Sequence, residues 1–161
     1  MVRVIFVCLG NICRSPSAEA VMNSLIEKKG LSGKIECDSA GTIAYHAGEP
    51  ADPRMKKHAL KRGYNLTSIA RKFTAEDFEN FDYIIAMDRS NYTDILALDK
   101  NAEFVDKISM MTNYCTEHDD DDVPDPYYGG PQGFEHVLDL LEDATAGLLE
   151  KIKEDFPEEF E

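Results

Sequence analysis

The chain begins with a short apolar run that leads through a glycine-containing loop into a helix start. Residues 2–7 are β-branched or aromatic at every position but one, which is typical of a strand buried on both faces of a parallel sheet. Gly10 follows in the loop, and Ser15 can cap a helix that has Pro16 at its first position and ends at Gly30. The sequence therefore predicts a central strand, a loop that glycine allows to fold tightly, and a helix in direct succession.

Strand and helix patterns alternate along the rest of the chain. Apolar runs predict three further strands, the last of them weaker, at residues 34–39, 81–87 and 104–108. Helical spacing predicts a short helix from Thr74 and three longer helices at residues 51–62, 88–98 and 134–156. This alternation predicts one α/β domain over residues 1–161, with a parallel sheet between helices on both faces and a ligand site beyond the carboxyl ends of the strands.

The net charge limits the partners of the chain. A formal charge of −14 argues against a general surface for nucleic acids or anionic membranes, since both depend on accumulated Lys and Arg. An anionic ligand must then be bound at a local site and not by the overall charge of the surface. We interpret the acidic runs at residues 119–122 and 150–161 as solvated, self-repelling surface rather than as metal sites.

The apolar segments and the cysteines indicate the cellular compartment of such a chain. Residues 2–9 are far shorter than the roughly 20 apolar residues that span a bilayer, and no cleavable leader is recognisable, so we expect a cytoplasmic protein. For the oligomeric state, a monomer is the default expectation. Four cysteines are too few for a disulfide framework and have no zinc spacing, so we expect reduced thiols and no metal or other cofactor. Cys8 and Cys13 flank a Gly-Asn turn, which makes a reversible disulfide between them conceivable.

The segment 8–15 combines the parts that phosphoryl transfer needs. Cys8 ends the first predicted strand, and Arg14 lies where the helix begins. Backbone N–H groups around a helix N-terminus form an anion cradle, and the helix dipole adds positive potential there. The same field favours thiolate over thiol, so Cys8 is the candidate nucleophile, while Arg14 offers a planar fork for two phosphoryl oxygens. The alternative for Cys8 is a buried structural thiol at a strand end.

The other residues of this segment are expected to shape it. Asn11 can fix the loop through its side-chain amide. Ser15 can donate a hydrogen bond to the Cys8 sulfur in addition to capping the helix. Further backbone N–H groups for the phosphate-binding loop come from Leu9, Gly10, Ile12 and Cys13.

A second region of interest is the long segment 112–133, which has lost all periodicity. Loops of this length within a domain are usually functional. A leaving phenolate or alkoxide needs a proton, and this segment supplies carboxylates at Asp119, Asp120, Asp121, Asp122 and Asp125. Spacing alone does not choose among them. We favour Asp125 because prolines stiffen its backbone on both sides and because Tyr127 and Tyr128 follow it.

Two motifs carry a family resemblance. Cys-Leu-Gly-Asn-Ile-Cys-Arg-Ser-Pro at residues 8–16 and Asp-Pro-Tyr-Tyr at residues 125–128 resemble the low-molecular-weight protein tyrosine phosphatases. Further matching segments extend the resemblance over nearly the whole chain, at residues 38–42, 70–71, 76–78, 81–84 and 87–91.

The resemblance implies a fold and a reaction. The fold is a flavodoxin-like, phosphotyrosine phosphatase I-like domain with a four-stranded parallel sheet. The reaction is hydrolysis of phosphotyrosine in proteins or peptides, through a phosphocysteine intermediate and with inorganic phosphate as product. It implies Cys8 as nucleophile, Arg14 as phosphate ligand, and Asp125 first as acid and then as base.

The resemblance also implies supporting residues. Ser39 and Asp88 belong to the network that holds the phosphate loop together with Asn11, and Cys13 can pair reversibly with Cys8 under oxidant. Contacts at the substrate rim are implied for Tyr45, His46, Tyr127 and Tyr128, of which the last two can be phosphorylated. Ser68 departs from the pattern, because the family often has a histidine of the same network there. The Tyr45-His46 position varies within the family, so we carry over no specificity subtype.

Two other readings compete with a phosphatase. An arsenate reductase uses a similar loop but relays a disulfide through further cysteines, and Cys37 and Cys115 are not the close pair that such a relay uses. A phosphate-binding module without catalysis would be expected to lose Cys8, Arg14 or Asp125, and all three are present.

Overall fold

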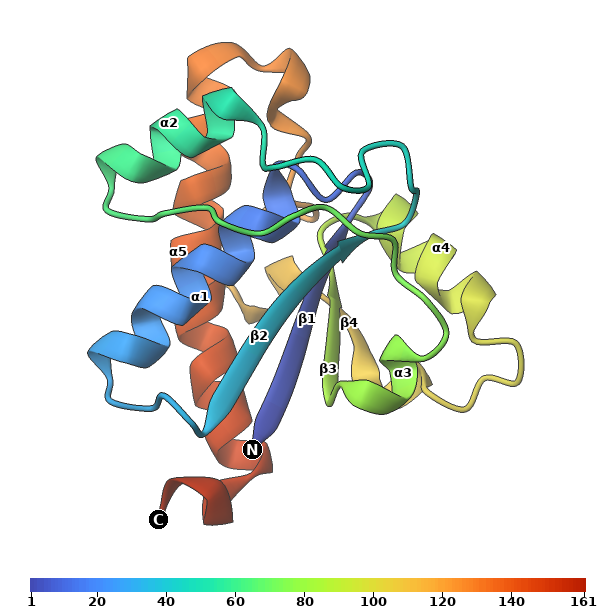
Figure 1. The fold of residues 1–161 in the computed structure, drawn as a ribbon. Helices are drawn as coiled ribbons and strands as arrows, with labels where there is room; N and C mark the ends of the chain where they lie inside the picture. The colour runs from blue at the N-terminus through green and yellow to red at the C-terminus, as the bar shows by residue number, and fades with distance from the viewer.

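β1 (Val2–Cys8) is the strand around which the sheet is built in the computed structural model of the chain (Figure 1). It pairs in parallel with β2 (Ile35–Gly41) on one side and with β3 (Tyr83–Ala86) on the other. The short strand β4 (Ile108–Met110) pairs in parallel with β3, so the strand order is β2-β1-β3-β4. This confirms the four-stranded parallel sheet predicted from the sequence.

Helices cover both faces of this sheet, which makes three layers (Figure 1). α1 (Arg14–Lys28), α2 (Pro53–Lys61) and α5 (Gly130–Asp155) lie on one face. α3 (Asp77–Asn80) and α4 (Arg89–Leu98) lie on the other. The predicted α/β architecture is therefore confirmed, and the carboxyl end of β1 points toward the start of α1.

The side chains of β1 alternate between two cores. Val4 and Phe6 join the core beneath α1 and α5, whereas Ile5 and Val7 join the core on the α4 side. All four are fully buried. Because a strand covered on both faces needs apolar residues at every position, the continuous apolar run and the central place of β1 have the same cause.

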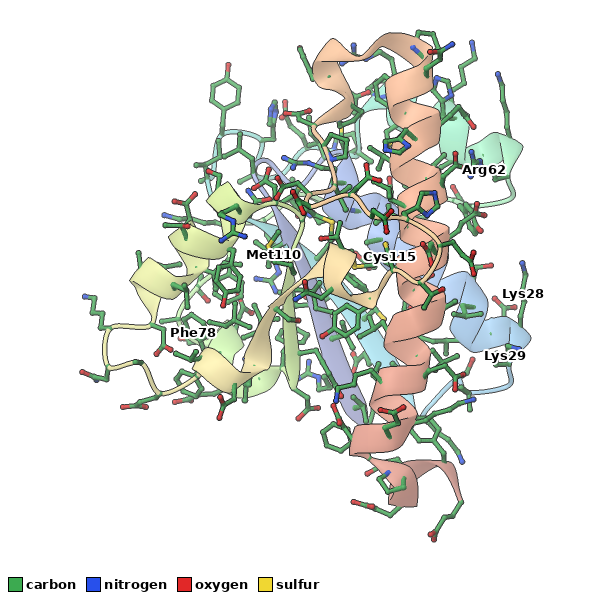
Figure 2. The ribbon with its side chains drawn as sticks, turned by 180° about the vertical axis from the view of Figure 1, so that it is seen from behind. Lys28, Lys29, Arg62, Phe78, Met110 and Cys115 are labelled. Carbon is green, nitrogen blue, oxygen red and sulfur yellow. The ribbon has the colours of Figure 1, made fainter. Side chains whose placement is uncertain are left out.

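Four 3₁₀ helices complete the structure, at η1 (Val105–Lys107), η2 (Met111–Tyr114), η3 (Pro126–Tyr128) and η4 (Pro157–Phe160). Seen from behind, Cys115 lies beside α5 (Figure 2), and its Sγ donates to the Leu140 carbonyl at 3.8 Å. The structure describes residues 1–161, except for the side chain of Tyr128. Among these described residues, no helix is both long and apolar enough to cross a membrane.

The fourth strand differs most from its predicted position. Residues 105–107 form η1, and β4 begins only at Ile108. The Asp99 carboxylate accepts hydrogen bonds from the backbone N–H groups of Glu103 and Phe104 at 3.0 and 2.9 Å. These bonds hold the segment in a turn before the strand, and a pattern of apolar residues does not reveal them.

The last helix starts earlier than predicted. α5 begins at Gly130, with Pro131 in its first turn, and not at Phe134. Proline fits the first turn of a helix because its missing N–H would have no partner there. Apolar spacing did not predict this turn, because its residues include no large apolar side chain. The other predicted helices and strands are present with boundaries shifted by a few residues.

Candidate active site

The loop between β1 and α1 curls around the Cys8 sulfur. Asn11 has a positive φ of 60°, which places it in the left-handed region, and its backbone N–H donates to Cys8 Sγ at 3.3 Å. The positive φ in this loop belongs to Asn11 and not to Gly10, the residue predicted to allow the tight fold. A Cβ at Gly10 would lie 2.9 Å from His46 Cδ2, so the His46 side chain would have to shift to admit it.

Gly41 at the end of β2 supports this loop from beneath. A Cβ at Gly41 would lie 2.8 Å from the Leu9 carbonyl oxygen and 3.2 Å from the Asn11 nitrogen. Just beyond it, Thr42 N–H donates to the Cys8 carbonyl at 2.9 Å. Sequence reasoning missed this role of Gly41. The available signal was a glycine at the end of the strand that pairs with β1, in register with Cys8.

Ser15 and Asn11 form a hydrogen-bonded chain to the nucleophile candidate. Ser15 Oγ lies 3.0 Å from Cys8 Sγ and receives a hydrogen bond from Asn11 Nδ2 at 2.8 Å. The other end of the Asn11 amide, Oδ1, accepts from the Arg71 N–H at 3.0 Å. The expected capping role of Ser15 was wrong, because α1 starts one residue before it and its hydroxyl faces Cys8.

Arg14 is nearly fully buried, with 3% of its surface exposed. Its Nη1 donates to Asp88 Oδ2 at 2.6 Å and to the Val123 carbonyl at 3.2 Å. Burial acts to lower the pKa of Arg14, but Cys8 and Asp88 outweigh it and raise the pKa. Asp88 also caps α4 by accepting from the Asn91 N–H at 2.7 Å. The start of α4 thus orients the guanidinium in the cleft.

Ser39, which was expected in the network that supports the loop, has a hydrogen-bond partner on α1. Its hydroxyl donates to Glu19 Oε1 at 2.6 Å. In the register of the sheet it pairs with Phe6, two residues before the end of β1, so it lies deeper than the loop. Burial raises the pKa of Glu19. Ser68, the departure from the family pattern, lines a separate polar cavity of about 310 Å³ together with Glu19.

Cys13 lines the same cleft as Cys8. Burial raises the pKa of its thiol to about 12, and the nearby Asp52, Cys8 and Asp125 act in the same direction. Cys13 is therefore a neutral thiol near pH 7. All four cysteines of the chain are free.

A cleft of about 100 Å³ opens above the loop. Its lining brings together Cys8, Arg14 and Asp125 with three rim residues, Ile43, His46 and Tyr127. Asp125 Oδ1 accepts from the Tyr127 N–H at 3.0 Å, which holds the carboxyl group in a tight turn at the cleft. Asp125 is the one of the five candidate aspartates that lines this space.

The rim residues differ in exposure. Tyr45 is 83% exposed and lies edge-on to the His46 ring, with centroids 4.8 Å apart. His46 Nδ1 pairs with Glu49. Tyr127 is 54% exposed. The side chain of Tyr128, also predicted at the rim, lies outside the described residues.

The acidic run at residues 119–122 is more ordered than a solvated surface. Asp122 Oδ1 accepts from the Arg89 N–H at 2.8 Å, and Asp120 Oδ2 pairs with His136 Nε2 at 2.8 Å. Two of the four aspartates therefore hold the loop against α4 and α5. Both aspartates remain partly exposed, so they are surface residues that also have partners.

Comparisons with known proteins agree with this geometry. Residues 3–158 match the family model described as low molecular weight phosphotyrosine protein phosphatase. A protein of Synechocystis sp., named provisionally as a low molecular weight protein-tyrosine-phosphatase, is 54% identical, with 91% of this chain and 94% of that protein covered. The low molecular weight protein-tyrosine-phosphatase of Streptomyces coelicolor is 42% identical, with 94% of each chain covered.

A solved structure is similar in fold as well as in sequence. The crystal structure of a protein tyrosine phosphatase from Entamoeba histolytica with Hepes in its active site has a TM-score of 0.93 and 49% identity, covering 96% of this chain and 99% of that one. Fold and site define an α/β protein whose β1–α1 loop curls around a cysteine. The chain belongs to the low molecular weight phosphotyrosine protein phosphatase family.

Proposed function

We propose that this chain is a protein tyrosine phosphatase that works through a phosphocysteine intermediate. The observation that carries the proposal is the meeting of Cys8, Arg14 and Asp125 in one cleft at the N-terminus of α1. Backbone N–H groups and Arg14 suit the three outer oxygens of a phosphoryl group, because both bring donors and positive potential to one point.

In the first step the Cys8 thiolate attacks phosphorus in line with the leaving oxygen. The S–P bond forms while the P–O bond to the phenol oxygen breaks, and the Asp125 carboxyl gives its proton to that oxygen. Arg14 opposes the charge on the phosphoryl oxygens during the transfer. Its tie to Asp88 supports this role, since an oriented guanidinium loses little freedom on binding.

In the second step water hydrolyses the phosphocysteine. The Asp125 carboxylate takes a proton from the attacking water, the new P–O bond forms, and the P–S bond breaks. The electron pair returns to Cys8, where the Ser15 hydroxyl and the Asn11 N–H can stabilise it as thiolate. Inorganic phosphate leaves, and no oxidant or reductant is consumed.

The proposed substrates are phosphotyrosine side chains of proteins or peptides. Leu9, Ile43 and Tyr127 are large, partly exposed apolar side chains around the cleft and suit contact with an aromatic ring. A thiol nucleophile works in a reducing compartment, which supports a cytoplasmic enzyme. We propose that it acts as a monomer.

The test is hydrolysis of p-nitrophenyl phosphate and of a phosphotyrosine peptide in the presence of EDTA, by wild type and by Cys8→Ser. The proposal predicts that wild type hydrolyses both substrates and Cys8→Ser neither. An inert wild type would favour a phosphate-binding module. Reduction of arsenate with a thiol donor, together with no hydrolysis, would favour the reductase.

A further inference from the structure

Asp52 connects α2 to the phosphate loop. Its backbone N–H donates to the Ile12 carbonyl at 2.8 Å. Its carboxylate caps α2 by accepting from the N–H groups of Arg54 and Met55 at 2.8 and 3.2 Å. Asp52 is 7% exposed, so the start of α2 is firmly placed relative to the loop that carries Cys8.

The Arg54 guanidinium is held by the same carboxylate at two points. Nε donates to Asp52 Oδ1 at 3.3 Å and Nη2 to Oδ2 at 3.1 Å. Two bonds to one carboxylate define the plane of the guanidinium, because the group is flat. Burial acts to raise the pKa of Asp52, but the hydrogen bonds from Arg54 and the backbone lower it, so the pair is charged near neutrality.

The face of this guanidinium packs on two aromatic rings. Arg54 Cζ lies 4.6 Å from the centroid of the Tyr127 ring and 5.3 Å from that of Phe134. Tyr127 belongs to η3 and Phe134 to the start of α5. Arg54 thus bridges α2 and both sides of the turn that leads from the cleft into α5.

The Tyr127 backbone is hydrogen-bonded to the acid candidate. Its backbone N–H donates to Asp125 Oδ1 at 3.0 Å, and Gly129 N–H donates to the Pro126 carbonyl at 3.1 Å. Gly133 packs so closely that a Cβ there would lie 3.3 Å from the same carbonyl. A displacement of the Tyr127 backbone would therefore move the N–H group that holds the Asp125 carboxyl group.

We propose that Arg54 is a positioning residue for proton transfer, which sets the place of Asp125 over the phosphate loop by joining Asp52 to Tyr127. The inference rests on the proposed role of Asp125. Arg54 acts through that residue. The contacts form one continuous path from the phosphate loop to the acid, and a misplacement of about 1 Å in such a group can cost on the order of 100-fold in rate.

The test compares kcat/KM for phenyl phosphate, a poor leaving group, with that for p-nitrophenyl phosphate, a good one. Arg54→Ala should lower kcat/KM roughly 30-fold for phenyl phosphate and less than about threefold for p-nitrophenyl phosphate, because nitrophenolate leaves without a proton. Arg54→Lys keeps the charge without the two-point geometry. Its loss of kcat/KM for phenyl phosphate should lie between those of wild type and Arg54→Ala, and should again exceed its loss for p-nitrophenyl phosphate. Arg62→Ala is the matched control, since Arg62 is the C-cap that follows α2 and pairs with Glu135 of α5 away from the cleft.

Asp125→Ala in the same assay separates this inference from the proposed function. A selective loss for phenyl phosphate in that variant supports the acid role, whatever Arg54 does. In the Asp125→Ala background, Arg54→Ala should then add no further selective loss. The inference is overturned by an equal loss on both substrates, by no loss, or by a selective loss that persists without Asp125. If Asp125→Ala is itself unselective, both assignments fail. Should Arg54→Ala melt below the assay temperature, the Arg54→Lys comparison decides.

Discussion

The Ser15 hydroxyl oxygen lies 3.0 Å from the Cys8 sulfur, and the Asn11 amide donates to that oxygen at 2.8 Å. Because the amide occupies a lone pair of Ser15, the hydroxyl hydrogen is directed to an acceptor. The sulfur is nearer than the alternative, the Ala40 carbonyl at 3.4 Å. The arrangement suits a sulfur that must leave with a negative charge.

Ser15→Ala should slow hydrolysis of the phosphocysteine. A hydrogen bond to a charged group contributes about 1.5–3 kcal/mol, so kcat should fall roughly 10- to 100-fold. The phenol released in the first turnover should then appear as a larger burst in stopped-flow measurements. Ser24→Ala, on the same helix but away from the cleft, serves as control. An unchanged kcat with no enlarged burst would show that the hydroxyl does not assist the leaving sulfur.

Gly41→Ala should damage the phosphate loop although it lies in another strand. The added methyl group meets the Leu9 carbonyl at 2.8 Å, and such overpacking costs about 1–3 kcal/mol. We expect a lower Tm and a raised KM for p-nitrophenyl phosphate. An unchanged Tm and an unchanged KM would mean that the loop adjusts to the added methyl group without loss of stability or of substrate binding.

Thr42→Val, at the adjacent position, should not lower the stability of the fold. Thr42 Oγ1 is buried without a hydrogen-bond partner among the described residues. Replacing an unpaired buried hydroxyl by a methyl group should leave the free energy of unfolding unchanged or raise it by about 1 kcal/mol. Urea denaturation measures this, and a clear loss of stability would indicate a partner for the hydroxyl.

Cys13→Ser should retain hydrolysis, in contrast to Cys8→Ser. With a pKa of about 12, the Cys13 thiol is protonated at neutral pH and is not the nucleophile. We expect kcat/KM within about fivefold of wild type, since the substitution is nearly isosteric. Loss of activity comparable to that of Cys8→Ser would give Cys13 a chemical role that its burial argues against.

Asp143→Asn should destabilise the start of the long loop. The Asp143 carboxylate accepts from the N–H groups of Thr116 and Glu117 at 2.9 and 3.0 Å and pairs with His118 at 2.7 Å. Burial acts to raise its pKa, but these bonds lower it to about 2. We expect a loss of about 1–3 kcal/mol in the free energy of unfolding near pH 7.

The pH dependence of that loss follows from the lowered pKa. The carboxylate contributes its full stabilisation above the ordinary value of 3.8 and loses it as the pH falls toward about 2. The difference between wild type and Asp143→Asn in urea denaturation should therefore shrink as the pH is lowered below about 4. Asp139→Asn, an exposed partner of Arg62, is the control. A difference that grows in acid would contradict the assignment.

The local part of the site was predictable from the sequence, and the parts built by distant contacts were not. Cys8 and Arg14 could be found because strand, loop and helix follow one another without interruption. Gly41 and Arg54 could not, since their importance depends on atoms far away in the chain, the Leu9 carbonyl and the Tyr127 ring. Asn11 in its left-handed conformation donates to Cys8 Sγ and accepts from the Arg71 N–H, and these tertiary hydrogen bonds cannot be read from a single sequence.

The same distinction between local and distant contacts applies to β1 and to Ser39. β1 was predicted well because a strand that is buried on both faces has a nearly continuous apolar sequence. Ser39 was assigned by resemblance to the network that supports the phosphate loop, and in the structure it pairs in register with Phe6 and its hydroxyl donates to Glu19. Register and side-chain direction are tertiary properties, and the motif alone does not contain them.

The measurement that tests the central claim most directly is trapping of the phosphoenzyme. Wild type and Ser15→Ala are mixed with p-nitrophenyl phosphate, quenched in acid within milliseconds, and analysed by intact mass and peptide mapping. The account predicts one phosphoryl group per chain on the peptide that contains Cys8, in larger amount for Ser15→Ala, and none for Cys8→Ser. A phosphoryl group on another residue, or hydrolysis without any trapped phosphoenzyme in either protein, would contradict it.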